Sequence, residues 1–60
     1  MNKEQIADLV ISFELDAKVN DTELAFGSKL TVEKIHQVKN QKTNLTEDEL
    51  HQLVDFISYY

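Results

Sequence analysis

Helix start signals are the feature that most constrains the fold of this 60-residue chain. In a capping box, a polar residue accepts the amide hydrogen of the third residue after it, whose own side chain bonds back to the first. The chain holds three pairs with this spacing, namely Asn2 with Gln5, Asn20 with Glu23, and Thr46 with Glu49. Each pair predicts a helix that begins at the following residue. Thr31 is a fourth residue that can cap a helix.

Apolar residues recur at helical spacing between these signals, and no stretch keeps the alternation of a strand. They are Ile6, Leu9, Val10, Phe13 and Ala17 in the first third and Leu50, Leu53, Val54 and Ile57 in the last. The expected helices span residues 3–17, 21–27, 32–40 and 47–58. Because the chain has one glycine and no proline, no linker is visible. We therefore expect an all-α fold, a small four-helix bundle that forms a single domain over residues 1–60.

The composition excludes several functional classes. Without cysteine the chain has no disulfide or thiolate site, and His36 and His51 lack the spacing of zinc ligands, so no metal or cofactor is expected. No serine has a recognisable base beside it, so we expect neither an enzyme nor a small-molecule substrate. The longest apolar run is Leu9-Val10-Ile11, too short for a membrane span, and a cytoplasmic protein is the expectation.

Charge is distributed unevenly along the sequence. The formal charge of the chain is −5, yet residues 26–44 contain four lysines and one acid, whereas both flanking segments are acidic. An acidic chain is a poor match for nucleic acid, because lysine and arginine drive binding to phosphate. The local excess of lysine has two interpretations, an ordinary solvated surface or a nucleic-acid contact.

The helix expected over residues 32–40 has two different faces. Ile35 and Val38 fall on one side, and the other side carries polar residues, namely Glu33, His36, Gln37 and Asn40. The major groove of DNA admits an α-helix, and Gln and Asn can pair with adenine through two hydrogen bonds. Two short helices joined by a tight turn, the second with these two faces, are typical of a major-groove reader.

The segment TELAFGSKLTVEKIHQVKNQKTNLTEDELHQLVDFI, residues 22–57, resembles the core of the phage repressor/Cro-type (XRE-like) helix-turn-helix transcriptional regulators. The places that this family fills with characteristic residues hold Leu24-Ala25, Leu30-Thr31, Ile35, Val38, and Thr46 with Leu50. The resemblance implies a lambda-repressor-like helix-turn-helix DNA-binding domain that lacks the fifth helix, with its motif at about residues 21–40.

The resemblance also implies a function and a set of contact residues. The function is sequence-specific binding of double-stranded DNA by a small transcriptional regulator of phage or bacterial type, which acts by occupying an operator. By matching place, Val32, Glu33 and Gln37 are expected to read bases. The geometry of the helix adds Lys34 and His36 to these base-reading candidates. Asn40, Lys42 and Thr43 are expected to meet the phosphate backbone.

Several residues depart from the family pattern and favour an alternative function. Asp21 stands where Gln is usual, Lys29 and Gln41 stand where Gly is usual, and Leu45 replaces a usual Pro. Glu33 adds a carboxylate to the reading face. The alternative is a protein-protein interaction module, antirepressor-like or adaptor, on a helix-turn-helix scaffold that no longer binds DNA.

Apolar residues outside the expected core suggest an interface. Ile11 and Leu15 lie opposite the main apolar face of the first helix. Phe56, Tyr59 and Tyr60 widen or extend the apolar face of the last. They are either the ordinary exposed apolar surface of a small domain or a partner surface, and a second copy in a homodimer is one partner that fits.

Overall fold

The start of each helix is fixed by the side chain of the residue before it. The computed structural model describes residues 1–60. It contains α1 (Lys3–Ala17), α2 (Asp21–Ser28), α3 (Val32–Lys39) and α4 (Glu47–Tyr59). The cap oxygens of Asn2, Asn20, Thr31 and Thr46 accept backbone amide hydrogens over donor–acceptor distances of 2.8 to 3.1 Å. The three predicted capping boxes are complete. The predicted all-α fold is confirmed, and each boundary lies within one residue of its prediction.

The ends of three helices are closed by residues in the left-handed conformation, and none of these residues is glycine. They are Lys18, Lys29 and Gln41, with φ of 57°, 64° and 59°. After α3 the amide of Lys42 donates to the carbonyl of Gln37 at 2.8 Å, which satisfies an orphaned carbonyl of the last turn. This closure ends α3 at Lys39, one residue before the predicted end.

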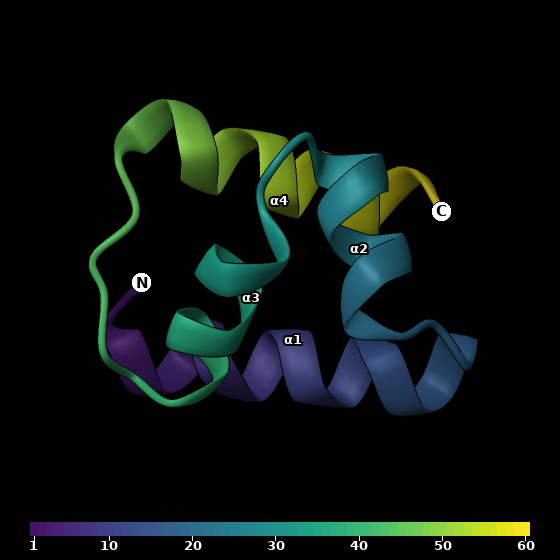
Figure 1. The fold of residues 1–60 in the computed structure, drawn as a ribbon, viewed down its shortest axis with the longest axis horizontal. Coiled ribbons are helices and arrows are strands. Elements are labelled where there is room, and N and C mark those ends of the chain that lie inside the picture. The colour runs from purple at the N-terminus through teal and green to yellow at the C-terminus, as the bar shows by residue number, and fades with distance from the viewer.

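The core is built from one side of every helix. Figure 1 shows α3 in the middle of the molecule, with α1 below it, α4 above it and α2 at one end. α3 packs against α1 and α2, and α2 packs against α4. The buried cluster comprises Ile6, Val10, Val19, Leu24, Ala25, Ile35, Val38 and Leu53. No helix has both the length and the hydropathy that crossing a membrane requires.

The single glycine lies in the last turn of α2, where α2 meets α4, and it does not form the C-cap. A Cβ added at Gly27 would overlap the ring of Phe56. That ring also meets Phe13 and Tyr60 edge to face, with centroids 6.0 and 5.5 Å away. Gly27 therefore lets an aromatic cluster from α1 and α4 lie directly against the backbone of α2.

Candidate nucleic-acid interface

The junction of α2 and α3 has a buried seam and an exposed outer face. Lys29, Leu30 and Thr31 join the two helices, and Lys29 turns the chain in the left-handed region. Ala25, Ile35 and Val38 are each at most 3% exposed, so the inner face of α3 lies against α2 in the core. The predicted orientation of Ile35 and Val38 is confirmed, and it turns the opposite face of α3 to solvent.

The residues predicted to contact DNA all lie on or directly after α3, and none is fully buried. Glu33, His36, Asn40 and Lys42 are exposed, whereas Val32, Lys34, Gln37 and Thr43 are partly buried. Val32 packs against the core, which leaves less of it available to a base than the sequence suggested. Asn40 is the cap that follows α3, and its amide nitrogen donates to the carbonyl of His36 at 2.9 Å. That hydrogen bond directs the amide back along the helix.

The first lysine of α3 is paired with a carboxylate from α4. The Lys34 ammonium lies 3.6 Å from Glu49, and both side chains are more than a quarter exposed. Glu49 also completes the capping box of α4, accepting the Thr46 amide hydrogen at 3.0 Å. This backbone hydrogen bond is the main reason that the pKa of Glu49 is lowered from its ordinary value of 4.5, with Lys34 contributing. An exposed pair of this length contributes little to stability, so it leaves Lys34 accessible to another anion.

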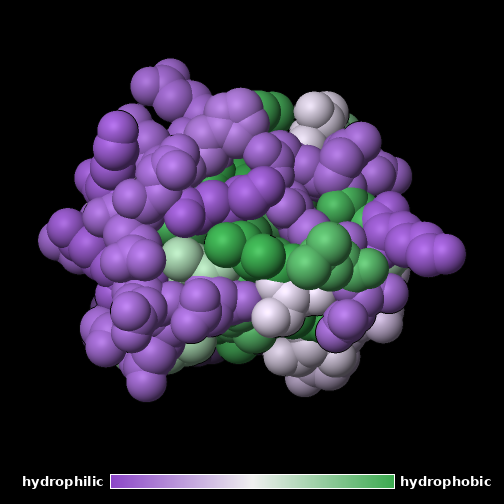
Figure 2. All heavy atoms as spheres, turned by 90° about the horizontal axis from the view of Figure 1, so that it is seen from below, coloured by the Kyte–Doolittle hydropathy of each residue, from purple (hydrophilic) through white to green (hydrophobic).

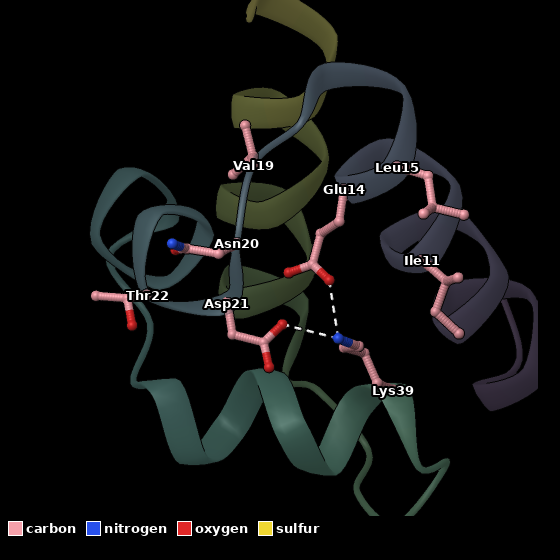
Figure 3. Close-up of a pocket in the computed structure, with 8 residues that line it drawn as sticks. All are labelled: Ile11, Glu14, Leu15, Val19, Asn20, Asp21, Thr22 and Lys39. Carbon is pink, nitrogen blue, oxygen red and sulfur yellow. Dashed lines mark hydrogen bonds and ion pairs between the residues drawn. The ribbon is translucent and has the colours of Figure 1, made fainter.

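The second lysine of α3 is held more firmly, by two carboxylates from two other helices. Lys39 lies 2.9 Å from Glu14 of α1 and 2.9 Å from Asp21 of α2. Figure 3 shows both carboxylates directed at the ammonium group from their separate helices. Asp21 also lies 2.7 Å from Nε2 of His36. We refer to Glu14, Asp21, His36 and Lys39 as the ion-pair cluster.

The pKa values within the ion-pair cluster move in different directions. Burial raises the pKa of Glu14 above its ordinary value of 4.5, and the neighbouring Asp21 carboxylate raises it further because it favours a proton on Glu14. The neighbouring Glu14 carboxyl in turn lowers the pKa of Asp21 below 3.8, helped by Lys39. The pKa of Lys39 is raised because hydrogen bonds to Glu14 and Asp21 favour the charged ammonium. One oxygen of Glu14 is buried without a hydrogen-bond partner, which fits a carboxyl that readily takes up a proton.

The cluster changes the charge that the basic segment presents. Residues 26–44 have a formal charge of +3, and the carboxylates of Glu14, Asp21 and Glu49 fold against its lysines. The formal charges of residues 26–44 and of these three carboxylates sum to zero. Of the four lysines, Lys29 and Lys42 make no ion pair. The segment is therefore less basic in the folded chain than in the sequence.

Sequence reasoning did not assign Glu14 or Lys39 to this surface. No local spacing relates Glu14 to Asp21 or to Lys39, because they come from three helices that meet only in the fold. Asp21 stands where the family usually has Gln, and its carboxylate was expected to be unfavourable beside phosphate. The structure adds that its side chain is 20% exposed and is bonded to Lys39 and His36, which the sequence did not indicate.

The five residues predicted to form an interface lie in two neighbouring places. Ile11 and Leu15 are exposed on α1 and line a hollow of about 590 Å³ beside Lys39. From the α1 side of the molecule, Figure 2 shows a hydrophobic band between hydrophilic margins. Phe56 is partly buried, whereas Tyr59 and Tyr60 are 88% and 68% exposed at the end of α4. Sequence reasoning missed Phe26 of α2, which is 88% exposed.

None of the family models, curated proteins or solved structures with which the chain was compared matches it. The resemblance to the repressor/Cro-type regulators remains a prediction based on the residues quoted above.

Proposed function

We propose that this chain is a small DNA-binding regulator whose α2 and α3 act as a helix-turn-helix and whose α3 enters the major groove. The observation that carries the proposal is the junction of α2 and α3. Two helices of eight residues are joined by three, with Ile35 and Val38 buried at the seam. This geometry presents the polar face of α3 on a rigid support, which major-groove reading needs.

The proposed contacts divide into two kinds. Gln37 is partly exposed in the middle of α3 and has both a donor and an acceptor for a base edge. Lys29 and Lys42 are the unpaired cations near α3, and Lys34 is held only by a weak exposed pair. We expect these three lysines to carry the phosphate contacts. Lys39 is expected to stay in the ion-pair cluster and act as a support for α3.

Salt dependence tests this division quantitatively. Three phosphate contacts predict that the logarithm of the association constant falls with the logarithm of salt concentration with a slope of about −2.7 per domain. We expect Lys42→Gln to reduce the magnitude of this slope by about 0.9. Lys18→Gln is the matched control, because Lys18 follows α1 and lies outside the basic segment. Fluorescence anisotropy with a labelled duplex would measure both slopes.

Sequence specificity requires a separate measurement. Selection from a random duplex pool should recover a preferred site, and Gln37→Ala should relax the preference at one base position without changing the salt slope. Recovery of no preferred site, with a salt slope that Lys42→Gln leaves unchanged, would contradict the proposal.

A second candidate function is a protein-protein interaction module, and the neutralised basic segment favours it. Three carboxylates from α1, α2 and α4 meet the lysines of α3, so the surface needs no phosphate to balance its charge. Absence of DNA binding at about 50 mM salt, where electrostatic binding is strong, would select this candidate. The two functions share one scaffold, and fold alone does not separate them.

A further inference from the structure

The end of the molecule where α2 meets the C-terminal part of α4 carries an aromatic knob beside a groove. Phe26 projects from α2 with 88% of its surface exposed. Beside it lies a groove of about 550 Å³, which we call the aromatic groove. It is lined by Val19, Thr22, Glu23, Phe26, Gly27, Phe56 and Tyr60. Figure 1 shows α2 and the C-terminus together at this end.

The groove is shaped by the aromatic packing that joins α2 to α4. Gly27 leaves room for the Phe56 ring against the backbone of α2, and Tyr60 stacks edge to face on Phe13 and Phe56. The packed rings of Phe56 and Tyr60 therefore form one wall of the groove, next to the exposed Phe26. Exposed aromatic residues beside a preformed hollow are typical of the centre of an interface.

We propose that the aromatic groove binds a second copy of this chain, with Phe26 of each copy inserted into the groove of the other. A two-fold contact brings the same patch of both copies together, so it needs a knob and a hole within one patch. Phe26 and the groove beside it supply both.

The charge of the groove also favours a second copy over a basic partner. Glu23 is the one charged residue that lines it. Its Oε1 already accepts the amide hydrogen of Asn20 at 3.0 Å in the capping box of α2. The groove therefore offers a basic partner one carboxylate, one oxygen of which is already used in the cap, whereas an aromatic ring needs none.

The area indicates that the dimer is weak. Fully burying an aromatic residue removes about 150–250 Å² from water, so Phe26 and Tyr60 of two copies would together bury roughly 600 Å². Stable interfaces bury at least about 1,200 Å², so the residues around the groove would have to supply the remaining area. We therefore expect a concentration-dependent equilibrium between monomer and dimer. Because each copy has a formal charge of −5, added salt should strengthen the dimer.

Sedimentation equilibrium of the full chain over a wide range of concentration tests the proposal without DNA. Phe26→Ser should weaken the dimer by about tenfold or more, since a central aromatic carries much of such an interface. Because Phe26 is 88% exposed, its loss should leave the thermal unfolding of the monomer nearly unchanged. Leu15→Ser is the matched control, because Leu15 is 74% exposed but lies outside the aromatic groove.

Two outcomes would overturn the proposal. One is a wild-type chain that stays monomeric at every concentration and salt. The other is a dimer that Leu15→Ser dissociates and Phe26→Ser does not, which would place the contact on the exposed face of α1. Either result would leave the proposed DNA binding untouched, because that proposal depends on the α3 face.

Discussion

Asp21→Asn separates the structural role of the ion-pair cluster from its effect on DNA binding. With His36 neutral, Glu14, Asp21 and Lys39 together carry a formal charge of −1 at the edge of α3. The substitution brings that charge to zero and keeps a side chain of nearly the same shape. Lys39 remains paired with Glu14, 2.9 Å away, so α3 keeps its link to α1.

The size of the effect follows from the distances in the cluster. The Asp21 carboxylate lies 2.9 Å from the Lys39 ammonium, which stands between it and solvent, so we take about twice this distance as the closest approach of a phosphate bound at the α3 face. Two unit charges about 6 Å apart repel by about 0.7 kcal/mol in water and by more near a protein surface. Salt screening reduces these values. We therefore expect Asp21→Asn to tighten DNA binding about three- to tenfold at low salt.

Anisotropy titrations with one duplex at low salt would measure this gain. Asp16→Asn is the matched control, since it makes the same change in net charge at an exposed residue of α1 that pairs with no residue of α3. Equal gains from the two variants would show that only the net charge matters, and the placement of Asp21 would then have no role. Weaker binding by Asp21→Asn, in a chain that stays folded by circular dichroism, would refute the reasoning outright.

Three further substitutions test the structure. Lys29→Gly should raise the free energy of unfolding in urea by about 1 kcal/mol, because glycine adopts the left-handed conformation of Lys29 without a steric penalty, and no gain would mean the turn is unstrained. Ile35→Ala should cost about 2–5 kcal/mol out of a total of roughly 3–9 kcal/mol, leaving much of the chain unfolded by circular dichroism. For Glu14, whose pKa is raised above 4.5, the native state binds more protons than the unfolded chain in the pH range just above that value. Stability should therefore fall as pH rises through this range, and Glu14→Gln should remove that part of the fall; an unchanged pH profile would argue against the shift.

The helices could be predicted from the sequence because their start signals are local. Asn2, Asn20, Thr31 and Thr46 each act within the first turn that follows them, so spacing alone identifies them. The helix ends were harder to predict, because a lysine or glutamine takes the left-handed position that glycine usually marks. The glycine of the chain instead accommodates Phe56, a contact between helices that no local pattern indicates.

The candidate site was only partly predictable, for the same reason. The polar face of α3 followed from helical periodicity, which places Gln37 and Asn40 opposite Ile35. The carboxylates that pair with the lysines of α3 could not be predicted from this periodicity. Glu14 and Glu49 come from other helices, and the sequence does not reveal how those helices cross α3. Counting charges along the chain therefore overestimated how basic the folded surface is.

Weak phosphate contact by one domain would make the proposed dimer important for the proposed function. A domain with about three phosphate contacts has a modest electrostatic affinity for any duplex. Two such domains joined through the aromatic groove would bind as one unit, because the second contact becomes intramolecular once the first has formed. DNA affinity would then fall in Phe26→Ser even though Phe26 lies away from the face of α3. A wild-type dimer that binds as one unit makes about six phosphate contacts, so its salt slope should be steeper than the slope of about −2.7 expected for the monomeric variant, although the opposing effect of salt on the dimer reduces the difference. An equal slope for both would mean that the two surfaces act independently.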